Sequence, residues 1–334
     1  MDYDQSLLQL FDNLVKEEQS SLDVPPLHTL LPHVCQAGQQ AGVLKETGAT
    51  LLQLPAGIPV AAAEGDQPAA LAGSLIGQAG MVSMSFGTSV VSNSVGDRAF
   101  VGVDKAVDQF CAPDGKPINM VWLRNGTTFL NTMVKSFSGA SDNENEFERV
   151  MPLLVQAAPD CGGLLALPFM DDEPGLNVHE GGTAMIVGLN GENATPGNIA
   201  KAALLSTIFN LKLGSEVLEQ QGYPRTEIVL SGGLTKTPEC GQIVADVFDT
   251  PVALLESAEE GCAWGGALLA KYRYLCEKDG TACTSWSEFL TSIAVEGHTR
   301  FVPDAQAVRE YEGVYKRYQK LMMVQPVLNE AVSL

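Results

Sequence analysis

The stretch Pro59–Ser92 constrains the fold more than any other part of the chain, because signals for a strand, a helix and a hairpin follow one another closely. Val60–Ala63 is a short apolar run with a β-branched start, which is typical of a buried strand. Asp66 comes where this run has ended, and Gln67, Pro68 and an Ala/Leu-rich segment follow. An Asp directly before a helix with Pro in its first turn is typical of an N-cap. The simplest interpretation of Asp66 is therefore a helix cap.

A tight polar turn closes the same stretch. Val82–Phe86 predicts a strand, Gly87, Thr88 and Ser89 predict a turn, and Val90–Val91 begin a returning strand. Such a turn can present backbone N–H groups and two hydroxyls to a phosphate. The sequence therefore predicts a hairpin that is suited to bind an anion.

Together, these two features resemble the FGGY carbohydrate kinases, a family with the actin-like ATPase fold. Its members carry a strand that ends in Gly-Asp-Gln or a close variant, and a Gly-Thr-Ser or Gly-Thr-Gly hairpin follows. Here these motifs are Gly65–Gln67 and Gly87–Ser89, in the same order. The resemblance implies that Asp66 is the catalytic base, that Asp66 and Gln67 contact the substrate, and that Gly87, Thr88 and Ser89 contact ATP. It also implies ATP and Mg²⁺ as cofactors.

Composition limits the classes of function. A chain of 334 residues with 45% hydrophobic residues can form one large or two ordinary domains with a substantial core. The net charge of −20 disfavours nucleic acid as a partner, because phosphate backbones require a clustered cationic surface. No apolar run approaches membrane length, so we expect no membrane partner.

The cysteines and histidines predict neither a metal site nor a disulfide framework. The seven cysteines are an odd number without tight pairing, and none forms a zinc motif with the four histidines. A reduced, cytoplasmic protein explains this pattern best. The first residues are acidic and no apolar segment follows them, so we expect no signal peptide.

Gly126 marks a second place where the backbone could approach a nucleotide. Ile118–Leu123 predicts a strand, and the helix that follows extends through Phe137. In the family, a glycine or small residue here contacts ATP, which assigns Gly126 to the nucleotide site. An ordinary glycine loop before a helix explains the residue equally well.

Paired glycines end a later strand. Glu227–Ser231 predicts this strand, and Gly232 and Gly233 precede a helix, which allows close approach of a ligand to backbone N–H groups. The family has its adenosine loop here, and the passage through Gln242–Asp246 resembles its pattern. A frequent Asn at the end of that loop is Thr237 in this chain, so the resemblance assigns Gly232, Gly233 and Thr237 to ATP. A strand–helix turn without a ligand is the alternative.

Other family passages are present with departures. The loop Asp171–Pro174 keeps a glutamate but lacks the arginine of the family's Gly-Glu-Arg-x-Pro pattern, and Leu205 stands where the second signature ends in an acidic residue. Small residues in Gly261–Ala267 predict a helix that lies against the nucleotide-binding loop. The departures indicate a divergent member of the family.

The resemblance extends from about Leu7 to about Leu321 and corresponds to the C-terminal portion of such a kinase. We interpret residues 1–79 as a remnant of the N-terminal domain that includes the strand before Asp66. We interpret residues 80–325 as the C-terminal, nucleotide-binding domain, and expect an α/β fold of the ribonuclease-H-like, actin-like ATPase type. Most of the domain that grips the sugar would then be absent.

The implied function is ATP-dependent phosphoryl transfer to a ketose or polyol hydroxyl. We expect the isolated chain to be incomplete for this reaction. The alternative is a non-catalytic nucleotide-binding or interaction remnant, which the departures at Leu205 and near Glu173 favour slightly. A third reading, a chaperone-type ATPase domain, conflicts with the Gly-Asp-Gln motif and the C-terminal helix. The expected partners are a small sugar or polyol, and either a second copy of the chain or a separate N-terminal half.

Overall fold

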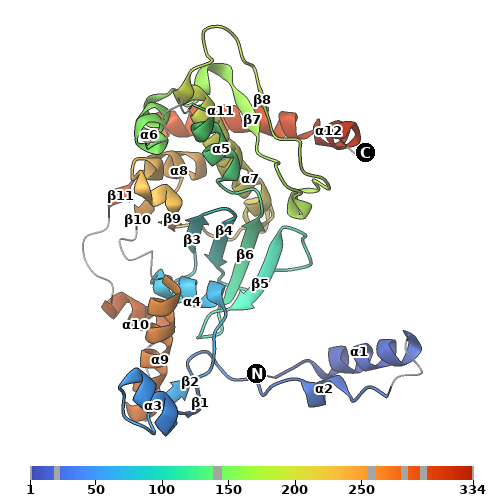
Figure 1. Cartoon of the computed structure of the whole chain (residues 1–334), viewed down its shortest axis with the longest axis vertical. Coiled ribbons are helices and arrows are strands. Elements are labelled where there is room, and N and C mark those ends of the chain that lie inside the picture. Colours follow the sequence, from blue (N-terminus) through green and yellow to red (C-terminus); the bar gives the residue numbers. More distant parts are fainter. Residues whose placement is uncertain are drawn as a thin grey trace. The chain divides into compact units, whose positions relative to one another are not determined.

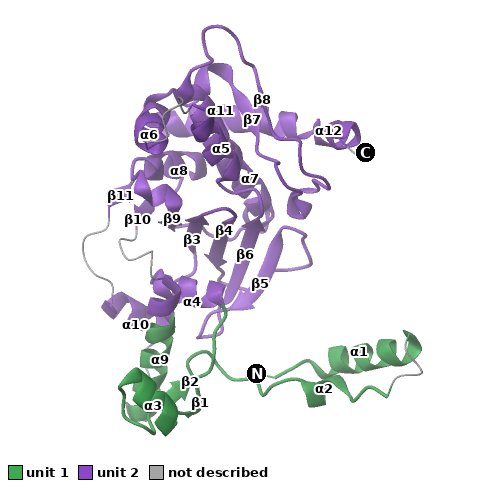
Figure 2. Cartoon of the chain, in the orientation of Figure 1, with its two compact units in different colours: residues 1–65, 266–283 green, residues 66–265, 284–334 purple. Residues whose placement is uncertain are grey.

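A computed structural model describes residues 2–18, 23–137, 145–254, 261–279, 285–293 and 299–332. The chain divides into two compact units, which Figure 2 shows in different colours. The smaller comprises residues 1–65 and 266–283, and the larger comprises residues 66–265 and 284–334. All the residues assigned to the site, from Asp66 to Thr237, therefore belong to one unit. The interpretation of residues 1–79 as a domain remnant stays a prediction.

The smaller unit contains short elements with little buried surface. They are α1 (Gln5–Glu18), α2 (Leu27–Leu30), β1 (Gln40–Val43), α3 (Glu46–Leu52), β2 (Pro59–Ala61) and part of α9 (Gly261–Asp279). In α1, the only buried residue is Leu8. The expectation of a buried strand after Pro59 is wrong, because β2 pairs with β1 in a two-stranded sheet that leaves it largely exposed.

A seven-stranded mixed sheet forms the centre of the larger unit, in the order β11-β10-β9-β3-β4-β6-β5. Its strands are β3 (Met81–Phe86), β4 (Val90–Val95), β5 (Val107–Cys111), β6 (Pro117–Leu123), β9 (Glu227–Gly232), β10 (Val252–Leu254) and β11 (Arg300–Phe301). β3, β9 and β10 run parallel, while the hairpins β3–β4 and β5–β6 are antiparallel and join through an antiparallel pairing of β4 with β6. The larger unit is thus an α/β domain with a mixed sheet, in agreement with the expected α/β class.

Helices cover both sides of this sheet, as Figure 1 shows. Alternating side chains of β3, such as Val82, Met84 and Phe86, are buried in the main hydrophobic core. The same core contains residues of helices that come later in the chain. Leu71 and Ile76 belong to a second, smaller core with Val95 and other residues. Besides the start of α9, the helices of the larger unit are α4 (Asp66–Gly73), α5 (Thr128–Ser136), α6 (Glu146–Gln156), α7 (Pro196–Gln220), α8 (Cys240–Phe248), α10 (Trp286–Ile293), α11 (Ala305–Met322) and α12 (Gln325–Val332).

The longest of these helices, α7, lies at the centre of the main core. Its N-cap Thr195 accepts a hydrogen bond from the Asn198 N–H (3.3 Å), and Pro196 occupies the first turn. Most of its residues are buried, including Leu204 and Leu205. Leu205 therefore packs in the core at the position where the family signature is acidic.

A separate antiparallel pair joins β7 (Leu165–Leu167) to β8 (Met185–Val187). Only Leu165–Leu167 of the apolar run Gly163–Met170 forms a strand. The backbone turns just before β7, with a 3₁₀ turn at Cys161–Gly163 and a positive φ at Gly163 itself. The segment between the two strands carries Glu173, which returns below as part of the site.

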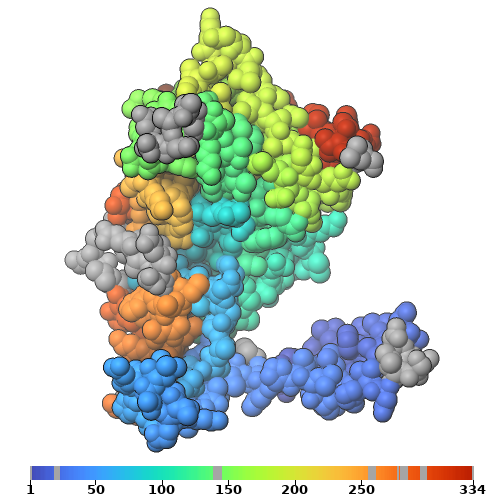
Figure 3. Space-filling model, viewed as in Figure 1, coloured from blue at the N-terminus to red at the C-terminus, as the bar shows by residue number. Residues whose placement is uncertain are grey.

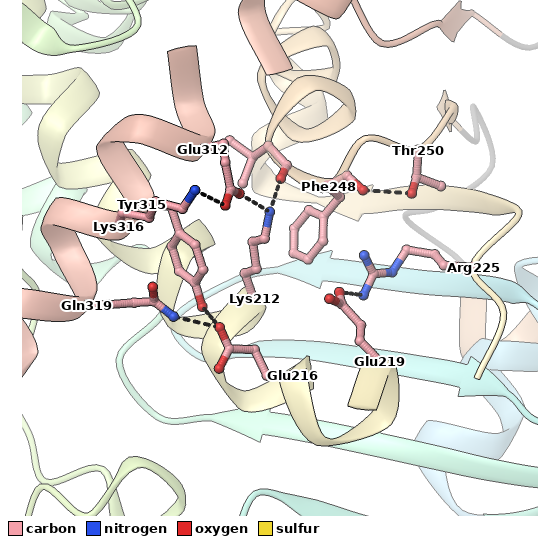
Figure 4. A network of polar contacts seen from close by, with 11 residues as sticks. Lys212, Glu216, Glu219, Arg225, Phe248, Thr250, Glu312, Tyr315, Lys316 and Gln319 are labelled. Atoms are coloured by element: carbon pink, nitrogen blue, oxygen red, sulfur yellow. Dashed lines mark hydrogen bonds and ion pairs between the residues drawn. The ribbon is translucent and has the colours of Figure 1, made fainter. Parts of the chain in front are cut away.

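A polar network joins α7, α8 and α11 (Figure 4). The Lys212 ammonium donates to the Val247 carbonyl at the end of α8 (2.7 Å) and lies 3.8 Å from Glu312. The Tyr315 hydroxyl donates to Glu216 (2.6 Å). Burial lowers the pKa of Lys212, and the nearby Glu312 carboxylate acts in the opposite direction. The network therefore gives polar groups inside a helical interface the partners that their burial requires.

The thiols correct one expectation. Cys35, Cys111, Cys161, Cys240 and Cys262 are free, but Cys276 in α9 is disulfide-bonded, so a fully reduced set of cysteines is wrong. Spacing along the sequence could not show which side chains meet in space. Among the described helices, none combines the length and the apolar character that crossing a membrane requires.

Replacement of Tyr315 by Phe tests the polar network. Removing the hydroxyl takes from Glu216 a hydrogen bond to a charged acceptor, so we expect the free energy of unfolding to fall by about 1–2 kcal/mol. Urea denaturation at neutral pH measures it. Lys316→Gln is the matched control, because the Lys316–Glu312 ion pair is exposed and its loss should change stability by less than about 0.5 kcal/mol. Equal stabilities for Tyr315→Phe and the control would contradict this role.

Candidate functional site

The turn Gly87–Ser89 joins β3 to β4 as a tight hairpin. The Gly87 N–H donates to the Ser89 carbonyl (2.9 Å), while Gly87 and Thr88 are exposed. Within the described part of the chain, the N–H groups and hydroxyls of Thr88 and Ser89 make no hydrogen bond. The hairpin thus offers donors to a ligand without breaking internal contacts.

Gly126 packs directly on this hairpin. Its N–H donates to the Thr88 carbonyl (3.0 Å), and the Thr127 N–H donates to the Gly87 carbonyl (2.8 Å). A Cβ at Gly126 would lie 2.5 Å from the Gly87 carbonyl oxygen, so only glycine permits this approach. On the other side, the Thr207 hydroxyl of α7 donates to the Gly126 carbonyl (2.8 Å). The segment is therefore fixed from two directions.

The helix α5 begins immediately after this contact. Its N-cap Thr127 makes no side-chain capping hydrogen bond, because its hydroxyl donates to Gly87 (2.9 Å). The first N–H groups of a helix lack intrahelical acceptors and carry the positive end of the helix dipole. Such an N-terminus beside a hairpin with unused donors is suited to hold phosphate groups.

The paired glycines lie at the same edge of the sheet. Gly232 ends β9 in register with Phe86, the last residue of β3, and a Cβ there would lie 2.5 Å from the Phe86 carbonyl oxygen. Its φ of 82° is the left-handed conformation that glycine adopts without strain. In Figure 3, the cyan residues of the β3–β4 segment and the gold residues around α8 lie side by side. The carboxyl ends of parallel strands are where open α/β sheets bind ligands.

Gly233 and Thr237 continue from this point. Gly233 is exposed and opens the 3₁₀ turn η3 (Gly233–Lys236). The Thr237 N–H donates to the Leu234 carbonyl (3.1 Å), and the Thr237 carbonyl accepts from the Cys240 N–H (2.9 Å) as α8 begins. The predicted adenosine loop is thus a compact turn between β9 and α8.

Asp66 is the first residue of α4 and is exposed. Its carboxylate accepts a hydrogen bond from the N–H of the adjacent Gln67 (2.8 Å), which differs from the usual capping bond to the second or third helical residue. The side chain of Gln67 accepts from Asn93 of β4 (3.4 Å). Asn93 lies about 10 Å along its strand from the hairpin end at Val90, from the usual rise per residue. The aspartate helix thus contacts the strand that leaves the hairpin.

Glycines of α9 hold α4 in place. A Cβ at Gly265 would lie 1.7 Å from the Ala69 carbonyl oxygen, and one at Gly73 would lie 2.1 Å from the Gly261 carbonyl oxygen. The two helix backbones therefore touch where no side chain intervenes. The expectation that these small residues pack on the nucleotide-binding loop is wrong, since their partner is the helix that carries Asp66.

A buried acid lies behind Gly126. Glu173 is only 1% exposed, and its carboxylate accepts hydrogen bonds from the N–H (2.9 Å) and the side-chain amide (3.1 Å) of Asn125. Burial raises the pKa of Glu173, and the hydrogen bonds from Asn125 oppose this rise. The sequence placed Glu173 in a family loop but gave no sign of its burial, since no apolar periodicity surrounds it.

The structure thus brings the hairpin, Gly126 and Gly232 together, with Gly233 and Thr237 on the adjoining turn, and places Asp66 and Gln67 on a helix in contact with β4. No group of three or more His, Cys, Asp or Glu side chains that could hold a metal ion occurs among the described residues. The arrangement can bind a phosphorylated ligand through backbone donors, and it presents one exposed carboxylate at the start of a helix.

Comparison with known proteins agrees with this geometry. Residues 82–274, more than half of the chain, match the model of the FGGY family of carbohydrate kinases, C-terminal domain. A xylulose kinase of Haemophilus influenzae is 26% identical over 86% of this chain and 56% of its own length. A glycerol kinase of Leptothrix cholodnii is 28% identical over 77% of this chain and 52% of its own length. The crystal structure of ligand-bound xylulose kinase from Lactobacillus acidophilus has a TM-score of 0.78 at 17% identity and covers 99% of this chain and 62% of that one.

The strand order and the structural likeness define an α/β domain of the actin-like ATPase fold. The chain belongs to the FGGY family of carbohydrate kinases. It spans about half the length of the curated relatives that it matches. The roles of individual residues in ATP or substrate binding therefore stay predictions.

Gly232→Ala tests whether the contact between β9 and β3 requires glycine. The new Cβ would meet the Phe86 carbonyl in a left-handed conformation, so we expect the free energy of unfolding to fall by about 2 kcal/mol or more. Gly233→Ala is the matched control, because its φ lies outside the left-handed region and its Cβ would lie 3.6 Å from the nearest atom, an ordinary contact. Chemical denaturation of both variants measures the difference, and equal losses would rule out the specific requirement at Gly232.

Proposed function

We propose that this chain supplies the nucleotide-binding part and the catalytic aspartate of an ATP-dependent kinase that acts on a ketose or polyol. The observation that carries the proposal is the convergence of the hairpin Gly87–Ser89, Gly126 and Gly232 at the carboxyl ends of two parallel strands. At Gly126 and Gly232, the absence of a Cβ allows a close approach to the backbone, and the hairpin has donors that are unused among the described residues. Family membership supports ATP as the phosphoryl donor.

The residues present fit a nucleotide. The phosphates would bind the N–H groups and hydroxyls of Thr88 and Ser89, next to the N-terminus of α5. The adenosine would lie on the turn from Gly232 to Thr237. Mg²⁺ would enter with the nucleotide and supply charge neutralisation, because magnesium is commonly held by substrate phosphates and few protein carboxylates.

Asp66 has the chemistry of a general base for the acceptor hydroxyl. As the hydroxyl oxygen forms its bond to the γ-phosphorus, the carboxylate of Asp66 takes the hydroxyl proton and ADP departs with the electrons of the broken bond. The donors of the hairpin stabilise charge on the phosphoryl oxygens. Gln67 would orient the acceptor from the neighbouring position on α4.

The proposal includes a partner. Because the chain spans about half of its relatives' length, we expect the acceptor to be gripped largely by residues outside it, on a separate N-terminal half or a second copy of the chain. The relatives' names, xylulose kinase and glycerol kinase, support a ketose or polyol as the substrate class. A cytoplasmic location stays a prediction, which the five free thiols support and the disulfide at Cys276 does not.

Calorimetry with Mg-ATP and a coupled ADP-release assay on a ketose and polyol panel test this function. We expect the chain alone to bind Mg-ATP and to phosphorylate no sugar at a useful rate, because a base acts only on a hydroxyl held within reach. Addition of a matching N-terminal half should produce turnover that Asp66→Ala abolishes, while Mg-ATP affinity stays unchanged.

The outcomes separate the candidates. Absence of Mg-ATP binding would overturn the nucleotide site. Binding without turnover under any condition would favour the non-catalytic remnant. Turnover that survives Asp66→Ala would leave Asp66 as a structural residue of α4, and robust turnover by the chain alone would show that its acceptor site is complete.

A further inference from the structure

A buried network surrounds Asn125, the residue before Gly126, and the proposed function gives it no role. Asn125, only 3% exposed, has every side-chain polar atom engaged. Its side-chain oxygen accepts from the Asp171 N–H (2.9 Å), and its amide donates to the carbonyls of Asp171 (3.0 Å) and Asp172 (3.3 Å) and to Glu173 (3.1 Å). One side chain thus ties the end of β6 to a loop some fifty residues later.

Glu173 is the charged centre of this network. Its carboxylate oxygen Oε2 accepts from both the backbone N–H and the side-chain amide of Asn125, so one oxygen binds the main chain and the side chain of the same residue. Its own backbone is fixed as well, because the Glu173 N–H donates to Val178 (2.8 Å) and the Val178 N–H donates back (3.1 Å). A buried carboxylate that accepts two hydrogen bonds from Asn125 holds this residue in one orientation.

That peptide leads directly to the phosphate-binding turn. Gly126 follows Asn125, and its N–H donates to the Thr88 carbonyl. Thr127 then donates to Gly87. A rotation of the backbone at Asn125, the residue that Glu173 holds, would therefore break the contact between Gly126 and Thr88.

We propose that Glu173 is a positioning residue that holds the hairpin Gly87–Ser89 through Asn125 and Gly126. It would not touch the nucleotide. Its effect on phosphate binding rests on the proposed function, whereas its effect on the hairpin does not. The neighbouring Asp172 does not share this role, because it forms an exposed ion pair with the Arg124 side chain.

Hydrogen exchange of the Gly126 and Thr127 amides tests whether Glu173 holds the hairpin in position. In Glu173→Gln, the amide oxygen can take the place of Oε2 and keep both bonds from Asn125, but these bonds lose the charge of their acceptor and become weaker. We expect both amides to exchange about tenfold faster than in the unaltered chain, because charge-assisted hydrogen bonds are roughly twice as strong as neutral ones. Asp172→Asn is the matched control and should leave the two amides unchanged.

Calorimetry tests the consequence for ligands. Glu173→Gln should weaken Mg-ATP binding about tenfold and leave the affinity for adenosine unchanged, since the adenosine loop lies on β9 and η3. Glu173→Ala should have the larger effect on both the amides and Mg-ATP. If Glu173→Ala does not fold, Glu173→Gln decides alone.

Faster exchange at Gly126 and Thr127, together with a selective loss of Mg-ATP affinity, supports the proposal. Exchange rates equal to those of Asp172→Asn overturn it, as do equal losses of Mg-ATP and adenosine affinity, which would indicate a general structural role. If the unaltered chain binds no Mg-ATP, the proposed function fails, and the exchange rates alone decide whether Glu173 positions the hairpin.

Discussion

The arrangement of the candidate site depends on the backbone contact between Gly126 and the hairpin Gly87–Ser89. Two N–H groups at the start of α5 donate to carbonyls of the hairpin, and a Cβ at Gly126 would collide with them. This contact orients the hairpin's carbonyls inward, which leaves the remaining N–H groups and hydroxyls for a ligand. Thr207 on α7 donates a hydrogen bond to the Gly126 carbonyl, and Glu173 on a distant loop accepts one from the N–H of the preceding Asn125. The central sheet completes the candidate site, because the pairing of β3 with β9 places Gly232 beside Phe86.

Much of this could be predicted from the sequence, because the decisive signals are local. The turn at Gly87–Ser89 follows from a polar tripeptide between two apolar runs, and the strand before Gly232 follows from its β-branched residues and the glycines that end it. Helices α7 and α11 also begin at local signals, the N-caps Thr195 and Asp304. Local patterns of this kind do not depend on which distant segments the chain later brings together.

The features that were missed depend on such distant contacts. The burial of Glu173 results from a loop that meets β6, and the packing of α9 on α4 results from glycines nearly two hundred residues apart in sequence. The exposure of β2 follows from its place in a sheet of two described strands, and the disulfide at Cys276 reflects spatial proximity. Asp66 shows the same limit at the level of function. The sequence marked its position, but the structure alone shows that it is exposed and that its helix contacts β4.

The most direct test of the account is a map of backbone amide chemical shifts, measured by NMR with Mg²⁺ and a non-hydrolysable ATP analogue added to the chain alone. The account predicts the largest shifts at Thr88, Ser89, Gly126 and Gly233, with adenosine alone affecting Gly233 and not the hairpin. Shifts confined to other surfaces of the larger unit, or none at saturating nucleotide, would contradict it.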